Sequence, residues 1–352
     1  MKKLFTLTML LFVTVVFAQE EEESKLSITG SVDAYYQTYL TASDDNAPTF
    51  GTAFADQSGF ALGMANVVMS YEGEKAGAVI DLVTGPRGAG ATFASDIVDG
   101  IVNQAYVYWN VSESTTLTFG RWNTFLGYEV IAPAGNFNYS CSYLFSSGPF
   151  SHMGLKADFA LSDDFSLMLA ITNPWDTNNT STSGEYALGA QLGYKGQFLN
   201  LYYDSGANGG LGFEIDYTGG FDLSDDFFLG INAAYQTSSY VFDDDGAVVS
   251  DDFSNGFYGV ALYPQLATSD DFTIGLRGEL FGTHAEEGED LPSALGLTLT
   301  GSYTVDNLIL KPEFRLDSLT NAEGGLYGNF IDSDGLPTDS LAAFTLAAIY
   351  TF

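Results

Sequence analysis

Two histidines, His152 and His284, are the residues of this chain best suited to acid–base or hydrolytic chemistry. His152 directly follows Ser151, and His284 lies shortly before Glu286 and Glu287. A hydrolase needs a histidine held beside a nucleophile or an acid, and neither neighbourhood has a recognisable catalytic spacing. The sequence therefore predicts no catalytic residues, and we keep an enzyme only as an alternative.

Two acidic segments, 243–246 and 332–335, have the Asp-rich, Gly-ending composition of calcium-loop fragments. A complete calcium loop also needs a glutamate at its last ligand position, which both segments lack. The lone Cys141 cannot form an internal disulfide. We therefore expect no specific metal site and no cofactor, and we interpret the acidic segments as solvated loops.

The charge balance is strongly acidic, with 45 Asp and Glu against 11 Lys and Arg and a net charge of −34. Nucleic acid is excluded as a partner, because proteins bind its phosphates with Lys and Arg. Many of the acids fall in polar segments such as 243–245 and 251–252, between apolar stretches. Those stretches are rich in Phe and Tyr, and aromatic residues make up 15% of the chain.

Residues 306–317 show the pattern that recurs along the chain, in which apolar and charged residues alternate. Leu308, Leu310, Phe314 and Leu316 share one face of a strand, and Lys311, Glu313, Arg315 and Asp317 share the other. After the N-terminal stretch there is no apolar run of about 18 residues or more, as a membrane helix would need. Strands with one apolar and one charged face throughout a chain are typical of a transmembrane β-barrel.

Sixteen segments of this kind can be delimited. They are 26–40, 59–73, 76–84, 99–111, 114–122, 151–162, 165–173, 184–195, 197–204, 209–222, 227–240, 253–266, 271–283, 293–305, 307–319 and 340–352. Short turns follow the even-numbered segments and longer loops follow the odd-numbered ones. The exception is the short connection 205–208, which follows the ninth segment. Outer-membrane barrels combine an even strand count with short periplasmic turns and long extracellular loops. The sequence therefore predicts an all-β fold, a transmembrane antiparallel up-and-down β-barrel of about 16 strands.

Residues 1–18 lie outside this pattern. Lys2 and Lys3 precede an apolar stretch that ends at the small residue Ala18, which is the layout of a cleaved secretory signal peptide. We therefore predict a signal peptide at 1–18, an acidic leader at 19–25 and the barrel at 26–352.

The parity of the alternation predicts which charges face the lumen, because a charge on the lipid face at mid-membrane costs about 2–4 kcal/mol. The predicted inward charges are Asp33, Lys156, Asp158, Asp204, Glu214, Asp216, Arg277, Glu279, Lys311, Glu313, Arg315 and Asp317. Arg121 has the parity of the lipid face, and we place it at the outer rim. Many other inward positions are small, including Gly189, Gly275 and Thr345, which favours an open lumen. Pro312 lies within a predicted strand, where it would remove a hydrogen bond of the ladder. We therefore expect a local distortion there, or a strand shifted from the bounds given above.

The longest loop, at about 123–150, is rich in aromatic residues and Asn and poor in charge. A loop exposed to water would not carry so many aromatic side chains, so we expect it to fold into the barrel and narrow it. The constriction candidates in and beside this loop are Arg121, Tyr128, Glu129, Asn136, Asn138 and Tyr139.

Several short motifs lie between residues 100 and 176. They are Asn103-Gln104-Ala105-Tyr106, Gly120-Arg121, Gly127-Tyr128-Glu129, 136–142, Gly148-Pro149-Phe150 with His152 and Gly154, and Thr172-Asn173-Pro174-Trp175-Asp176. With these motifs the chain resembles the OmpL-like β-barrel porins of Gram-negative bacteria. Cys141 departs from the pattern, where Arg or a polar residue is expected. The resemblance implies an outer-membrane, porin-like channel and does not define its solute.

The function expected is passive diffusion of small hydrophilic solutes or ions, with a mild preference for cations, because the predicted inward acids outnumber the inward bases. The alternatives are an outer-membrane enzyme of the phospholipase or protease type, and a closed structural or adhesive barrel. The expected partners are outer-membrane lipid, lipopolysaccharide, small solutes or ions, and further copies of the chain in a homo-oligomer.

The first prediction concerns export. The signal peptide should be removed after Ala18, and the mature chain should fractionate with the outer membrane as a β-rich protein. N-terminal sequencing, cell fractionation and circular dichroism measure these properties. Recovery in the soluble periplasm, or a helix-rich spectrum, would contradict the prediction.

Overall fold

The computed structural model describes residues 25–43, 50–93, 99–178, 184–204, 212–238, 241–242, 248–250, 255–284, 293–320 and 330–352. The proposed signal peptide at 1–18 and residues 19–24 of the acidic leader lie outside these ranges. So do the acidic segment 243–246 and the glutamates at 286–287.

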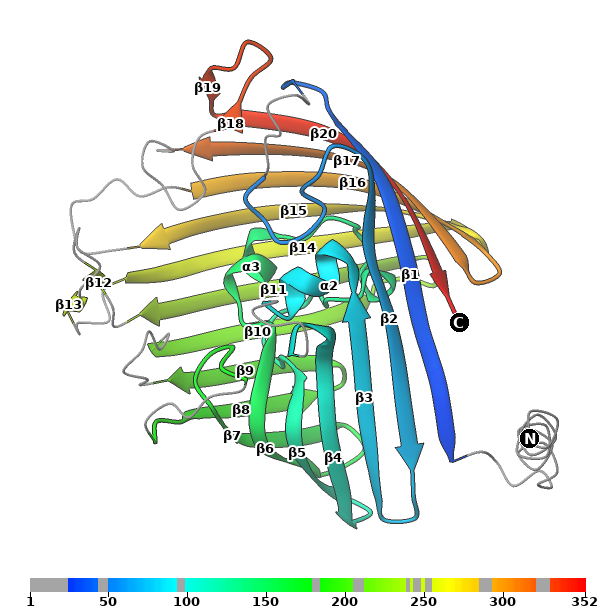
Figure 1. Cartoon of the computed structure of the whole chain (residues 1–352), viewed down its shortest axis with the longest axis vertical. Coiled ribbons are helices and arrows are strands. Elements are labelled where there is room, and N and C mark those ends of the chain that lie inside the picture. Colours follow the sequence, from blue (N-terminus) through cyan, green and yellow to red (C-terminus); the bar gives the residue numbers. More distant parts are fainter. Residues whose placement is uncertain are drawn as a thin grey trace, which may run out of the picture.

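Sixteen antiparallel strands form a closed barrel in which β1 pairs with β20 (Figure 1). They are β1 (Leu26–Tyr39), β2 (Gly59–Glu72), β3 (Ala76–Thr84), β4 (Val102–Ser112), β5 (Thr115–Asn123), β6 (Ser151–Ala160), β7 (Phe165–Thr172), β8 (Ala187–Tyr194), β9 (Gln197–Asp204), β10 (Gly212–Asp222), β11 (Phe227–Ser238), β14 (Asn255–Ser269), β15 (Phe272–His284), β16 (Ser293–Val305), β17 (Leu308–Thr320) and β20 (Ser340–Thr351). The predicted architecture and strand count are confirmed. Strand ends differ from the predicted ones by a few residues, as at Asp99–Ile101, which form the 3-10 turn η2.

The side chains alternate across the barrel wall as the period of two requires. On β15, Leu276 is 37% exposed on the outer surface, whereas the neighbouring Arg277 is 2% exposed inside. Because a bilayer core offers no hydrogen bonds, a closed sheet with an apolar outer face is one of the few structures that can cross it. The outer surface therefore suits lipid, and the charged residues of the strands lie inside.

Two prolines interrupt the hydrogen-bonded ladder without changing its register. On β17, Pro312 pairs with Leu346 of β20, but pairing with β16 lapses between Glu313 and Leu310. On β14, Pro264 has the same effect on the pairing with β15. A proline has no N–H to donate, so the distortion predicted at Pro312 is confirmed, and Pro264 is a second site that the sequence analysis did not single out.

Short elements that the sequence did not predict lie in the loops. They are α2 (Gly85–Ala91), η3 (Pro133–Gly135), α3 (Tyr143–Ser147), and the hairpins β12 (Val241–Phe242) with β13 (Val248–Ser250) and β18 (Phe330–Ile331) with β19 (Pro337–Thr338). Figure 1 shows α2 and α3 inside the ring of strands. No helix of the described ranges is long and apolar enough to cross a membrane.

The second prediction tests the outer face. Leu299 lies at the middle of β16 and Val305 at its end, both exposed on the same face. Leu299→Lys should lower the free energy of unfolding by about 2–4 kcal/mol, and the matched Val305→Lys by about 0–1 kcal/mol, because the cost of a cation depends on membrane depth. Denaturant unfolding in lipid vesicles measures both. Equal losses would show that this face does not lie across a bilayer.

Candidate functional site

Residues 124–150, which we call the inner loop, connect β5 to β6 and lie inside the barrel (Figure 1). The base of the loop is closed by a hydrogen bond from Thr124 N to Phe150 O of 3.0 Å. Tyr143 and Leu144 of the loop pack in one buried cluster with wall residues that include Phe257 and Phe281. The loop is therefore a packed part of the barrel interior.

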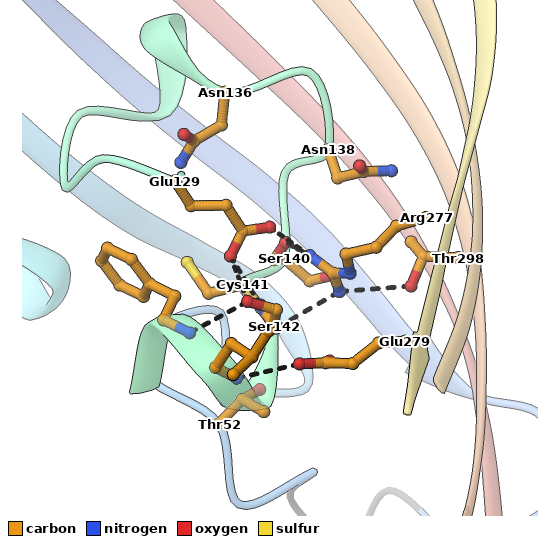
Figure 2. A network of polar contacts seen from close by, with 12 residues as sticks. Thr52, Glu129, Asn136, Asn138, Ser140, Cys141, Ser142, Arg277, Glu279 and Thr298 are labelled. Carbon is orange, nitrogen blue, oxygen red and sulfur yellow. Dashed lines mark hydrogen bonds and ion pairs between the residues drawn. The ribbon is translucent and has the colours of Figure 1, made fainter. Parts of the chain in front are cut away.

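Two wall carboxylates hold the backbone of the inner loop. Glu313 accepts hydrogen bonds from Tyr139 N at 2.7 Å and Ser140 N at 3.0 Å. Glu279 accepts from Tyr143 N at 3.0 Å and Leu144 N at 2.8 Å, at the start of α3 (Figure 2). Charge-assisted bonds of this kind are among the stronger hydrogen bonds in proteins. Both carboxylates are buried, so they fix the loop to β15 and β17.

Wall aspartates form a second set of anchors. Tyr139 Oη donates to Asp33 Oδ2 at 2.5 Å, and Tyr143 Oη donates to Asp317 Oδ2 at 2.8 Å. Gly127 N donates to Asp216 Oδ1 at 3.0 Å. The inner loop is thus held by acids from four strands: β1, β10, β15 and β17.

Arg277 of β15 joins the loop to the wall through an ion pair. Its Nη1 lies 2.7 Å from Glu129 Oε1 and donates to Ser140 O at 2.5 Å (Figure 2). The other oxygen of Glu129 accepts from both the N–H and the hydroxyl of Ser142, each at 2.7 Å. All of these groups are buried, and the pair therefore fixes residues 129–142 in one arrangement.

Three arginines converge on Cys141. Arg277 and Arg315 donate to Cys141 O at 3.3 Å and 3.0 Å, and Arg87 Nη2 lies 3.4 Å from Cys141 Sγ. Burial raises the pKa of the Cys141 thiol to about 12, so this side chain is a neutral thiol. A fourth cation at position 141 would meet three others, which is a physical reason for the departure noted in the sequence.

Arg87 is the residue of this network that the sequence analysis missed. It lies in α2, donates to Ile131 O at 2.7 Å and to Tyr139 O at 3.3 Å, and is 2% exposed. Its guanidinium also lies 4.7 Å from the centre of the Phe54 ring. Strand parity gives no information about a loop residue, and no local signal marks Arg87 as buried.

Small wall residues provide space for large loop side chains. A Cβ atom added to Gly189 would lie 2.6 Å from Phe125, and one added to Gly275 would lie 2.4 Å from Phe137. Because such distances are far below van der Waals contact, a larger residue at either position would require the phenylalanine ring to move. From the sequence, small inward residues such as these two glycines favoured an open lumen. In the structure, the space at these two positions is occupied by side chains of the inner loop.

The remaining loop candidates also contact the wall. Lys311 Nζ donates to Pro133 O at 3.1 Å and to Asn136 O. Asn138 Nδ2 donates to Thr300 Oγ1 at 2.7 Å. The ring of Tyr128 stacks on that of Tyr263, with centroids 4.5 Å apart.

Four candidates lie apart from these contacts. Lys156 and Asp158 form an ion pair of 2.8 Å with each other. Arg121 was expected at the outer rim, but it is buried at 6% exposure and interacts electrostatically with Asp176. Glu214 is 2% exposed, and its Oε2 has no hydrogen-bond partner among the described residues.

Two motifs quoted from the sequence meet in space. Asp176 Oδ1 accepts from Phe150 N and Ser151 N, both at 2.9 Å, where the inner loop enters β6. Burial raises the pKa of Asp176 to about 6 although these N–H groups favour its charged form. Trp175 N donates to Asp204 at 2.8 Å. The segment 172–176 therefore fixes the end of the inner loop.

The two histidines have structural partners. A ring nitrogen of His152 lies 2.9 Å from Thr124 Oγ1, and the ring stacks on Phe125 at 4.9 Å. His284 Nε2 lies 2.8 Å from Gln236 O. Within the described ranges, no three His, Cys, Asp or Glu residues are grouped so that they could hold a metal ion.

A family profile described as "Putative beta-barrel porin-2, OmpL-like" matches residues 25–352. No protein of curated function matches the sequence.

Solved structures share the fold at low sequence identity. An anion-selective porin from Comamonas acidovorans is 11% identical, with a TM-score of 0.58 over 93% of this chain and 99% of that one. Salmonella typhi OmpF in complex with daunomycin is 13% identical, with a TM-score of 0.57 over 93% and 97%. In vitro folded OmpT of Vibrio cholerae in its trimer form is 10% identical, with a TM-score of 0.54 over 93% and 99%. At such identities the likeness shows the fold alone.

The third prediction compares two buried glutamates of the wall. Glu279→Gln should lower the free energy of unfolding by about 1–3 kcal/mol, because it replaces an acceptor of two loop N–H groups with an amide. The matched Glu214→Gln should cost less than about 0.5 kcal/mol, or should stabilise, since Oε2 of this buried side chain has no hydrogen-bond partner among the described residues to lose. Denaturant unfolding in micelles measures both. An equal or larger loss at Glu214 would show that the loop contacts of Glu279 contribute little.

Proposed function

The chain belongs to the OmpL-like beta-barrel porin-2 family, and we propose from that premise that it is an outer-membrane channel for passive diffusion of small hydrophilic solutes or ions. The family match extends over the whole described barrel. The proposal includes export through a cleaved signal peptide and contact with outer-membrane lipid and lipopolysaccharide.

The observation that carries the proposal is the inner loop, which narrows a barrel wide enough to hold water. A pocket of about 380 Å³ lies on the side of the loop facing the short turns. A second pocket of about 190 Å³ lies near Gln57 and Pro86, toward the long loops. In the proposed channel, solutes enter these two spaces from opposite sides and pass the inner loop between them.

A closed structural barrel is the second candidate, and the packing of the lumen is the observation that favours it. Buried clusters there combine wall and loop residues, such as Met64 and Val83 with Ile131 and Phe145. The enzyme alternative has less support, because the polar contacts described for His152 and His284 are to a threonine and a backbone carbonyl. Conductance distinguishes a channel from a closed barrel.

The fourth prediction tests the constriction. Purified protein should form channels in planar bilayers, and deletion of residues 130–147 should raise single-channel conductance several-fold, because it removes the loop segment that fills the lumen. The control is deletion of 333–336, an exposed segment between β18 and β19, which should leave conductance unchanged. Heat-modifiable electrophoretic mobility checks that both variants fold. Absence of conductance in the parent would support a closed barrel instead.

The proposed selectivity is a mild preference for cations. Glu279, Glu313 and Asp33 are bound by neutral N–H or O–H donors, so these hydrogen bonds leave their negative charges in place. The buried arginines reduce the local excess of acid, but the chain as a whole has a net charge of −34. A negative field at the mouth of a narrow pore concentrates cations.

The fifth prediction is the sign of the reversal potential under a KCl gradient. The sign should correspond to a preference for potassium at about 0.1 M salt. The preference should weaken toward 1 M salt, because the Debye length falls from about 10 Å to about 3 Å and the charges of the pore are screened. A chloride-selective sign at low salt would show instead that the arginines beside the inner loop determine the field in the pore.

A further inference from the structure

The pocket of about 380 Å³ beside the inner loop has the chemistry of a solute-binding site, and we refer to it as the vestibule pocket. One wall is the inner loop from Tyr128 to Asn138. The other consists of residues near the short-turn ends of four strands, including Phe228 of β11, Gln265 of β14 and Ser302 of β16. Its volume lies within the range of pockets that hold small ligands.

Aromatic rings make up the apolar part of the vestibule pocket. Tyr128 and Tyr263 stack at 4.5 Å with their planes 24° apart, and Phe137 and Phe228 also line the space. Flat apolar surfaces with hydroxyl groups at their edges suit ligands that are apolar on one face and polar around the rim. A pyranose ring has this character.

The two ionised side chains that line the pocket already have partners. Lys311 donates to Pro133 O and Asn136 O. Glu129 is paired with Arg277 and accepts two hydrogen bonds from Ser142. A charged solute would have to displace these buried bonds, and breaking a buried ion pair is costly. The pocket therefore disfavours ions as bound ligands.

Neutral polar groups supply the remaining hydrogen-bonding capacity. The amide of Gln265 and the hydroxyl of Ser302 belong to half-buried wall residues. An amide and a hydroxyl can each donate and accept, which matches solutes that carry several hydroxyl groups.

We propose that the vestibule pocket binds one neutral polyhydroxylated solute of mono- or disaccharide size. This inference rests on the proposed channel function and names a class of solute that would use it. Because the pocket lies on the short-turn side of the inner loop, the solute binds there after it passes the loop from outside, or before it passes from the periplasm.

Maltose is the probe for the test, with gluconate and glucosamine as charged comparators. Maltose added on the short-turn side of a planar bilayer should reduce single-channel conductance at millimolar concentration, and more strongly than either charged sugar. Gln265→Leu and Tyr128→Leu should each raise the half-blocking maltose concentration at least fivefold. Tyr106→Leu, on β4 and outside the pocket, is the matched control and should leave it unchanged.

Stronger block by gluconate than by maltose would overturn the inference, because it would mean that Lys311 is available to anions. An unchanged half-blocking concentration in both pocket variants would also overturn it. If the parent does not conduct, the proposed channel function fails separately, and calorimetric titration of maltose into the detergent-solubilised protein decides the inference. Heat of binding that both pocket variants abolish supports the pocket, and no heat from the parent overturns it.

Discussion

The structure depends on one constraint: irregular backbone at membrane depth must find its hydrogen bonds within the protein. The inner loop meets this constraint with wall carboxylates, since Glu279 and Glu313 together accept four of its backbone N–H groups. An unsatisfied buried N–H costs about 1–3 kcal/mol. Four anchored N–H groups therefore restrict the loop to one position on the wall.

The charged side chains inside the barrel hold the inner loop and the wall together, in addition to any effect they have on ions. Arg277 and Arg315 are fully buried and satisfied by Glu129, Asp317 and loop carbonyls. Groups with so many fixed partners do not reorient toward a passing ion. The space beside the loop is therefore bordered by charged groups that already have fixed partners, together with aromatic and amide side chains.

The sheet could be predicted from the sequence, and the site only in part. Alternation between faces identifies Arg277, Glu279 and Glu313 as inward residues, because a strand has a strict period of two. It does not identify their partners, which belong to a loop far away in the chain and without any period. The burial of Arg87 and the packing of Phe137 against Gly275 depend on the same contacts between loop and wall. Because these contacts could not be predicted, the sequence suggested an open lumen where side chains of the loop lie.

The anchors of the inner loop also imply an order of assembly. Tyr139 and the Glu313 that binds it are 174 residues apart, and Tyr143 and Glu279 are 136 apart. Bringing residues at such separation together costs loop-closure entropy, which other contacts must offset, and Glu279 and Glu313 are in place only as parts of their strands. The inner loop therefore cannot reach its final position until β15 and β17 have joined the sheet. In an incompletely inserted barrel, the inner loop does not yet fill the lumen.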